Sequence, residues 1–459
     1  MTDRLALALD RASAARLIPG NALRHLPDSV AALEAMLELI ASARRTVHFE
    51  NYIIRDDRTG RRFADALEDR ARAGVQVRVL YDAFGSVGTS RRFWRELRRA
   101  GVEVRAFGPL LTSGFFQLFS RDHRKLIVID GLEAMMGGLC IGDEWAGDPE
   151  RGRMPWRDTM LSVRGPAVAV LEGSFARVWG TTGAPLPPGT FAPASEPCGT
   201  SALRVIDGVP AQSRAYRAVQ MLAAAAQERL WITDAYLVAP PPLYASLVDA
   251  AKSGVDVRLL LPGTSDIPVV RTFSRIGYRD LLRAGARVFE YRGPMLHAKT
   301  LVVDKGWGRV GSTNLNISSL LGNYELDIIA ECDSLTEALA AQFRHDAAQS
   351  REIVLVERRR LPARLVRAPD PPALPAASHK RSRRELQAAA AIALVQVAGG
   401  ARRMIAGAAA IALAVVGALL LLFPTVTSVV LASGALAISL SFAGYALARR
   451  RRHRRSDAA

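Results

Sequence analysis

Residues 296–304 read Leu-His-Ala-Lys-Thr-Leu-Val-Val-Asp, and this stretch decides how the rest of the chain is interpreted. It holds His297, Lys299 and Asp304 in the order His-x-Lys-x4-Asp, and a Gly-Ser-Thr-Asn turn follows at 311–314. The same order occurs earlier, at 123–130, where a Gly-Gly turn follows at 137–138. A lone histidine near a strand end is most often structural. The repetition is what indicates a function.

One copy already suggests a phosphate site. Side chains alternate along a strand, so His297 and Lys299 point the same way, while the apolar run 301–303 suits a central, doubly buried strand. An imidazole and an ammonium beside the donors of Ser312 and Asn314 suit a phosphate anion. A histidine with a pKa near 6.5 can attack phosphorus or protonate a leaving oxygen. A covalent route needs one histidine for each task, and two copies supply both.

Composition narrows the classes of partner. A chain of 459 residues is long enough for two or more domains, and its net charge of +17 favours polyanions, either nucleic acid or an anionic membrane. The cysteines are far apart without metal-ligand spacing, so neither a disulfide framework nor a structural zinc site is expected. The apolar run 5–9 is too short for a signal peptide, and Asp10 interrupts it.

The apolar periodicity predicts an α/β fold in which one pattern occurs twice. A helix capped by Asp28 or Ser29 precedes the first βαβαβ pattern, and most helices end before a glycine. We predict strands at 46–54, 75–81 and 102–107 and helices at 61–73 and 90–100. The second pattern has strands at 230–238, 255–261 and 286–291 and helices at 213–227, 242–252 and 272–284. An apolar insert at 108–121 precedes the first motif, either as a core segment or as a lipid-facing lip.

The C-terminal part differs in composition. We expect a Pro-rich and basic linker with an amphipathic stretch at 362–400, two transmembrane helices within 404–447, and a basic tail at 448–459. Arginines on both sides of this hairpin place both ends in the cytoplasm by the positive-inside rule. A buried pair of soluble helices is the alternative. The remaining domains are an N-terminal segment 1–20, a first repeat 21–190 and a second repeat 200–361.

The duplicated motif resembles that of the phospholipase D superfamily, and the chain looks most like the bacterial cardiolipin synthases. The resemblance runs from about residue 21 to 357. It rests on both motifs and on these further stretches: 50–52, 80–82, 85–86, 137–144, 156–158, 165–168 and 323–325. It implies two pseudo-symmetric α/β repeats that share one active site, with no metal and no other cofactor.

The resemblance also implies residue roles. The catalytic set is His123, Lys125, Asp130, His297, Lys299 and Asp304, with His123 as nucleophile, His297 as acid and the two aspartates bracing the strands. Ser312, Asn314 and Gly138 would bind phosphate along with the lysines. Glu325 would orient a catalytic imidazole, and Asp158 would do the same in the first repeat. The chain departs from the family pattern at Cys140, where asparagine is usual, and at 316–319.

Four functions fit these features. The first is phosphatidyl transfer between anionic phospholipids, as in joining two phosphatidylglycerols with release of glycerol. Hydrolysis by a phospholipase D, a membrane-attached nuclease and a non-enzymatic scaffold are the others. The hairpin disfavours the nuclease, so no nucleic acid partner is expected, and the intact His/Lys pairs disfavour the scaffold. No obligate protein partner is evident. The expected location is the bacterial inner membrane, with the catalytic repeats facing the cytoplasm.

Overall fold

The computed structural model describes residues 3–108, 120–191, 195–358 and 361–367. Most of the apolar insert, both apolar spans of the expected hairpin and the basic tail lie outside these residues. Among the helices of the described part, none is both long and apolar enough to cross a membrane.

The first half of the chain follows the predicted βαβαβ order. The order of elements is β1 (Ile18–Leu26), α2 (Ser29–Ser42), β2 (Thr46–Asn51), α3 (Arg58–Arg72), β3 (Gln76–Asp82), α4 (Arg91–Arg99) and β4 (Glu103–Phe107). After the insert come β5 (Lys125–Ile129), β6 (Glu133–Gly137), α5 (Asp143–Ala146), the short 3-10 helix η2 (Pro149–Arg151), β7 (Met160–Arg164) and α6 (Ala167–Thr181). The Asp28 carboxylate caps α2 by accepting from the Ala31 N–H. Strand β2 ends three residues earlier than predicted.

The second half repeats this order. Its elements are β8 (Ser201–Gly208), α7 (Arg214–Ala225), β9 (Arg229–Thr233), α8 (Pro241–Lys252), β10 (Asp256–Pro262), α9 (Pro268–Arg283), β11 (Arg287–Tyr291), β12 (Thr300–Val303) and β13 (Trp307–Gly311). These are followed by the π-helical turn η3 (Ser318–Gly322), β14 (Glu325–Glu331), α10 (Asp333–Ala348), β15 (Ser350–Arg358) and β16 (Leu361–Arg367). Strand β16 pairs with β15, so the region that we expected to be linker from 362 onward begins with a strand.

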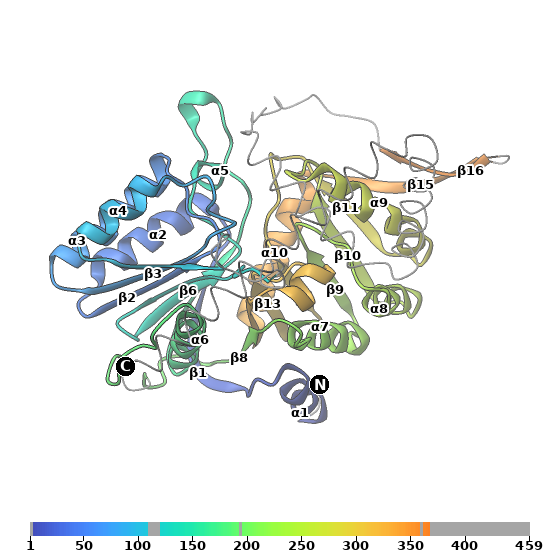
Figure 1. The fold of residues 1–459 in the computed structure, drawn as a ribbon. Helices are drawn as coiled ribbons and strands as arrows, with labels where there is room; N and C mark the ends of the chain where they lie inside the picture. The colour runs from blue at the N-terminus through green and yellow to red at the C-terminus, as the bar shows by residue number, and fades with distance from the viewer. Residues whose placement is uncertain (1–2, 109–119, 192–194, 359–360, 368–459) are drawn as a thin grey trace, which may run out of the picture. The chain divides into compact units, whose positions relative to one another are not determined.

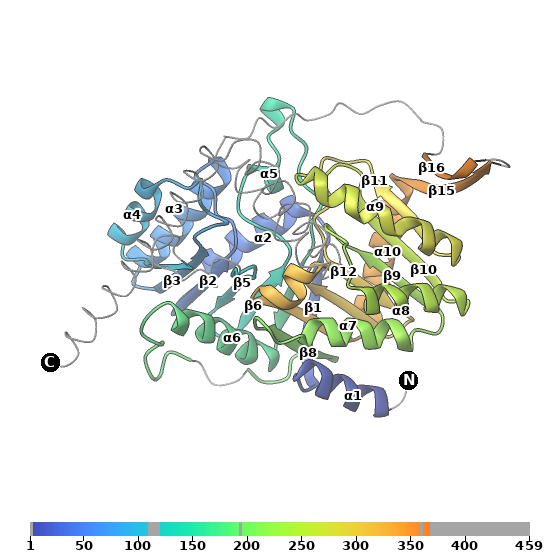
Figure 2. The same ribbon diagram turned by 45° about the vertical axis from the view of Figure 1, so that its right-hand side comes forward.

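The two halves form one sheet of 16 strands (Figure 1). Strands β2, β3 and β4 run parallel, as do β9, β10 and β11, and β1 joins the halves by pairing with β7 on one side and β8 on the other. Helix α1 (Asp3–Ser13) packs against α7 (Figure 2), and its Leu9 is buried in the core of the second half. We predicted residues 1–20 as an N-terminal segment before the first repeat. In the structure its Leu9 lies in the second core, and β1 begins at Ile18 in the seam, the region where β1 joins the two halves.

Three large apolar cores flank this sheet in the described part of the chain. Helices α2, α3 and α4 contribute to a core of the first half, and α7, α8 and α9 to a core of the second. Helices α6 and α10 cover the other face, where a third core includes residues from both halves. The second motif strand, β12, is buried on both faces as predicted: Leu301 and Val303 lie in one core, and Val302 lies in another.

Candidate active site

Each motif histidine lies in a segment that is paired with the other half of the chain. The His123 N–H donates to the Tyr324 carbonyl at 3.0 Å, and the His297 N–H donates to the Arg157 carbonyl at 2.7 Å. These bonds belong to two short parallel bridges, Asp122 with Tyr324 and Arg157 with Leu296. The backbone therefore brings both histidines to the seam between the halves.

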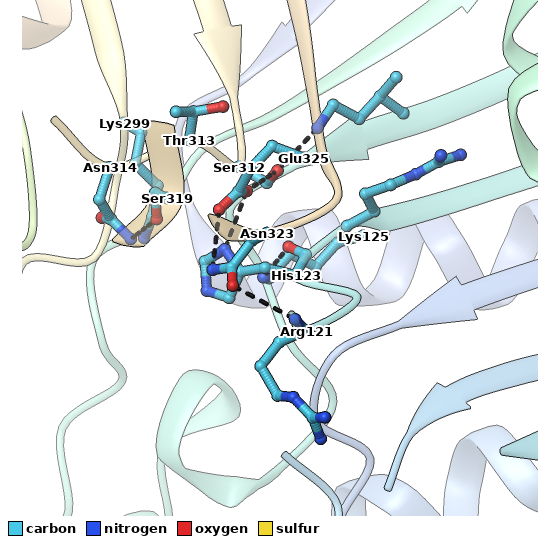
Figure 3. A network of polar contacts seen from close by, with 12 residues as sticks. Arg121, His123, Lys125, Lys299, Ser312, Thr313, Asn314, Ser319, Asn323 and Glu325 are labelled. Carbon is cyan, nitrogen blue, oxygen red and sulfur yellow. Dashed lines mark hydrogen bonds and ion pairs between the residues drawn. The ribbon is translucent and has the colours of Figure 1, made fainter. Parts of the chain in front are cut away.

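Glu325 holds the imidazole of His123. Its Oε2 lies 3.0 Å from Nδ1 of His123 and accepts a 2.5 Å hydrogen bond from the Ser312 hydroxyl, while Oε1 accepts from Asn323 at 3.4 Å (Figure 3). The Tyr52 ring contacts His123 in a T-shaped arrangement, with centroids 4.8 Å apart. Because Nδ1 is engaged by the carboxylate, Nε2 is the nitrogen left for chemistry.

Asp158 holds the other histidine. Its Oδ2 lies 2.6 Å from Nδ1 of His297 and accepts from the Trp145 indole at 3.1 Å, and Oδ1 accepts from the Thr159 N–H at 2.8 Å. We expected Asp158 to serve the first repeat, but it lies against the histidine of the second. The physical reason is the Arg157–Leu296 bridge, which places the residue after Arg157 beside the residue after Leu296.

The motif lysines are buried and arranged alike. The Lys125 ammonium donates to the His123 carbonyl, and the Lys299 ammonium donates to the His297 carbonyl. The Lys125 ammonium also lies 5.0 Å from the centre of the Tyr52 ring. Burial lowers the pKa of Lys299 to about 8, with nearby Asp158 opposing the shift and Lys125 adding to it. A lysine with this pKa still carries its charge at neutral pH and can bind a phosphate.

The two histidine–carboxylate pairs differ electrostatically. Burial lowers the pKa of His123 well below its usual value, and Lys125 and Lys299 add to this shift. Burial and Lys299 also lower the pKa of His297, but Asp158 opposes them. Burial raises the pKa of Glu325 to about 7. Burial would also raise that of Asp158, yet His297 and Lys299 lower it to about 2. The neutral form is therefore favoured at both histidines, but an imidazolium at His297 would lie beside an ionised carboxylate, whereas one at His123 would lie beside a carboxyl that is partly neutral near pH 7.

The motif aspartates lie at the far ends of their strands. The Asp130 carboxylate accepts from the backbone N–H groups of Arg44, Arg45 and Thr46 at 2.7–2.9 Å. Asp304 accepts from those of Gln227, Glu228 and Arg229 at 2.8–3.2 Å. Both residues have positive φ, 57° and 49°. These contacts fasten the strand end to the loop before β2 or β9, as expected for a bracing role.

Apart from the lysines, the residues that we expected to bind phosphate differ in the hydrogen bonds that their polar groups already make. Ser312 uses its hydroxyl on Glu325 and on the Leu326 N–H, so it holds the carboxylate. Asn314 is buried, and its Oδ1 accepts no hydrogen bond from the described residues. The Gly138 N–H, which we expected to bind phosphate, donates to the Thr159 carbonyl instead. A Cβ at Gly138 would lie 2.2 Å from Oδ1 of Asp158, so this glycine makes room for that carboxylate.

Several neighbours of the histidines were not given a role from the sequence. Tyr52 and Trp156 lay in stretches that supported the family resemblance, but nothing there indicated their contacts. Trp145, Trp156 and Tyr236 surround His297, with ring centroids 5.6, 5.9 and 6.0 Å from its own. Cys140 is buried, and burial raises the pKa of its thiol. Within the described residues, no cluster of three or more His, Cys, Asp or Glu side chains could hold a metal ion.

Comparisons with known proteins identify the family. The family model described as "Cardiolipin synthase, PLD-like domain" matches residues 36–144 and 219–347, and each range contains one motif. Cardiolipin synthase A of Pseudomonas aeruginosa is 36% identical over 356 residues, which cover 77% of this chain and 72% of that protein. Cardiolipin synthase A of Pseudomonas fluorescens is 36% identical over 333 residues, which cover 72% of this chain and 68% of that one.

The fold also matches a solved structure. The crystal structure of a phosphatidylserine synthase from Haemophilus influenzae superimposes with a TM-score of 0.60 at 13% identity, covering 79% of this chain and 92% of that one. At this identity the likeness concerns the fold. Together with the matched motifs and the relatives, it confirms the two-repeat α/β architecture. The chain belongs to the cardiolipin synthase family of proteins with phospholipase D-like domains.

Proposed function

We propose that this protein is a phosphatidyltransferase that makes cardiolipin from two phosphatidylglycerols and releases glycerol. The observation that carries the proposal is the crosswise pairing of His123 with Glu325 and of His297 with Asp158. It supplies two imidazoles with defined free nitrogens beside two buried lysines. The names of the relatives, cardiolipin synthase A, support the choice of substrate and product.

In the first step, Nε2 of His123 attacks the phosphorus of phosphatidylglycerol. The bond between phosphorus and the glycerol headgroup breaks, and the leaving oxygen takes a proton from Nε2 of His297. A phosphatidyl group is then bonded to His123, and His297 is neutral. Lys125 and Lys299 stabilise the negative charge that grows on the phosphoryl oxygens.

In the second step, the headgroup hydroxyl of another phosphatidylglycerol gives its proton to Nε2 of His297. Its oxygen attacks phosphorus, and the bond to His123 breaks with its electron pair returning to the imidazole. Both histidines regain their starting states. We assign the nucleophile to His123 because its pKa is lowered further, and the acid to His297 because the ionised Asp158 stabilises an imidazolium.

The test is to incubate the purified full chain with labelled phosphatidylglycerol in mixed micelles. Cardiolipin and glycerol in equal amounts are the expected products. Phosphatidic acid in place of cardiolipin would mean that water resolves the intermediate and that the enzyme is a hydrolytic phospholipase D. If no lipid is turned over while a DNA phosphodiester is cleaved, the lipid assignment is wrong.

We also propose that the protein is bound to the bacterial inner membrane with its catalytic halves in the cytoplasm. The support is the pair of apolar stretches within 404–447 and the arginines that flank them. Protease added to intact spheroplasts should leave the catalytic part uncut, whereas protease added to inverted vesicles should digest it. The opposite pattern would contradict the proposed orientation.

A further inference from the structure

Arg124 stands between His123 and Lys125 but points away from them. Its side chain is fully buried, with Nη1 3.0 Å from Oδ1 of Asp207 and Nη2 3.1 Å from Oε2 of Glu50. Glu50 lies on β2 of the first half, whereas Asp207 lies on β8 of the second. The second motif has Ala298 at the matching position. This ion pair therefore crosses the seam beside one histidine only.

Strand β8, which carries Asp207, pairs with β14, which carries Glu325. In the antiparallel register of β8 and β14, Asp207 is opposite Leu326, and Gly208 is opposite Glu325. Glu325 is the carboxylate that holds His123. The Arg124–Asp207 pair thus fastens the segment that carries His123 to β8, which pairs with the strand β14 that carries Glu325.

A comparable ion pair serves the other histidine. Arg157 immediately precedes Asp158, and its Nη2 lies 2.8 Å from Oδ2 of Asp346 on α10 in the second half. Nη1 of the same guanidinium donates to the Asp158 carbonyl at 2.5 Å and to the Thr159 hydroxyl at 2.8 Å. Arg157 and Asp346 are 11% and 3% exposed. The segment that carries Asp158 is therefore fastened to the half that carries His297.

Stability is a weak reason for such pairs. Removing charges from water costs nearly as much free energy as their attraction returns, so a buried ion pair is often no better than an apolar contact. What such a pair does supply is a fixed geometry. Each of these two pairs fixes the contact between a histidine and a carboxylate that come from different halves, and an error of about 1 Å in such a contact can cost on the order of 100-fold in rate.

We propose that Arg124 with Asp207, and Arg157 with Asp346, are positioning residues that act through the two histidine–carboxylate pairs. The first acts on His123 and Glu325, and the second acts on His297 and Asp158. This inference rests on the proposed phosphatidyl transfer, because both pairs are tested through that reaction.

The first experiment removes the acidic partner and leaves its arginines in place. For Asp207 these are the buried Arg124 and the exposed Arg177 of α6, whose Nη2 lies 2.5 Å from Oδ2. Asp207→Ala and Asp346→Ala should each lower kcat by about 10- to 100-fold with little change in KM, because the histidines move but the lipid site remains. Asp207→Asn should recover most of the activity, since its amide oxygen can still accept from Arg124. The matched control is Glu331→Ala, which removes a partner of the buried Arg204 at the other end of β14. Its kcat should stay within about twofold of wild type.

The second experiment is a set of double-mutant cycles. Glu325→Gln should cost about tenfold less on the Asp207→Ala background than in wild type, because the contact it weakens is already displaced. Asp158→Asn should cost the same on that background as in wild type. On the Asp346→Ala background the pattern should be reversed. A loss of structure alone would not produce this crossed pattern.

The outcomes separate the inference from the function on which it rests. Additive cycles, or a fall in kcat for Glu331→Ala as large as for Asp207→Ala, would overturn the positioning role while leaving phosphatidyl transfer intact. If wild type makes no cardiolipin, the proposed function fails first. Near-ultraviolet circular dichroism and melting temperature identify any variant that does not fold. If Asp207→Ala does not fold, the Asp346→Ala variant carries the test: with melting unchanged, additivity between Asp346→Ala and Asp158→Asn would overturn the positioning role.

Discussion

Nδ1 of His297 lies 2.6 Å from Oδ2 of Asp158, a residue 139 positions earlier in the chain. The His123–Glu325 contact spans 202 positions in the opposite sense, since here the carboxylate follows the histidine. Each half therefore provides one histidine and one carboxylate, and neither half contains a complete pair.

Replacing either histidine should abolish turnover. His123→Ala and His297→Ala should each lower kcat by at least about 1,000-fold, because one loses the nucleophile and the other loses the acid and base. Both variants should fold and remain bound to the membrane. Activity near that of wild type in either one would refute the two-histidine mechanism.

The order of the histidines can be determined with a phosphatidyl ester of p-nitrophenol, a leaving group that departs without a proton. His297→Ala should release one equivalent of p-nitrophenol per enzyme and then stall, because its phosphohistidine cannot be resolved efficiently. His123→Ala should release none. Mass spectrometry should find the phosphatidyl group on His123. A burst from His123→Ala instead would reverse the assignment.

The two carboxylates should not be equally important. Asp158→Asn should cost about 1,000-fold or more, because a carboxylate whose pKa is about 2 is ionised throughout and stabilises the imidazolium. Glu325→Gln should cost on the order of 100-fold or less, because a carboxyl with a pKa near 7 is already partly neutral at that pH. Steady-state kinetics at pH 7 measure both. Equal losses would argue against this difference between the pairs.

Activity should decline on the basic side because of Lys299. Its pKa of about 8 lies below the usual lysine value, so the folded enzyme loses this proton first, and phosphate binding weakens as the pH rises through 8. We expect kcat/KM to fall above pH 8. In Lys299→Arg the guanidinium stays protonated, so this decline should be absent even if the rate is lower. A decline at the same pH in both proteins would assign it to another group.

The same group should affect stability. The folded pKa of Lys299 is lowered, so the unfolded chain binds the extra proton between about pH 8 and 10.4, and this group makes stability rise with pH across that window. The free energy of unfolding of wild type should therefore gain up to about 1.4 kcal/mol per pH unit relative to Lys299→Met. Urea unfolding at several pH values measures the difference. Parallel pH profiles would contradict it.

The motif aspartates should matter for stability more than for chemistry. Asp130→Ala and Asp304→Ala each lose a carboxylate that accepts from three backbone N–H groups, and each places alanine at a positive φ. We expect a loss of about 2 kcal/mol in the free energy of unfolding for each. The folded fraction should keep kcat within about threefold. Asparagine tolerates this φ and retains an acceptor, so Asp130→Asn and Asp304→Asn should be milder. A 100-fold loss of kcat in a stable variant would return these residues to the catalytic set.

The sequence was informative where the pattern is local. The βαβαβ order, the Asp28 cap and the doubly buried strand of the second motif depend on residues close together, and the structure confirms them. The role of Glu325 as a partner for an imidazole followed from the family motif. Its geometry agrees with that expectation, while its catalytic role stays a prediction.

The relations across the seam could not be obtained in this way. Nothing near Asp158 indicates that it meets His297, because the Arg157–Leu296 bridge that joins them depends on the packing of both halves. From the sequence, we considered the apolar run 5–9 only as a candidate signal peptide, because the burial of Leu9 depends on the packing of α1 against α7. The sequence could not show that the Gly138 N–H already has an acceptor. It donates to the Thr159 carbonyl, and this contact requires that β7 lie beside β6.

The exchange of carboxylates also affects how the enzyme is made. A ribosome that has synthesised everything through His297 has produced both histidines, yet His123 still lacks Glu325, and the Asp346 that anchors Arg157 is also missing. The His123–Glu325 contact and the Arg157–Asp346 ion pair can therefore both form only after α10 has been synthesised. A nascent or prematurely released chain would lack a competent centre, so incomplete products of synthesis would not attack phospholipids.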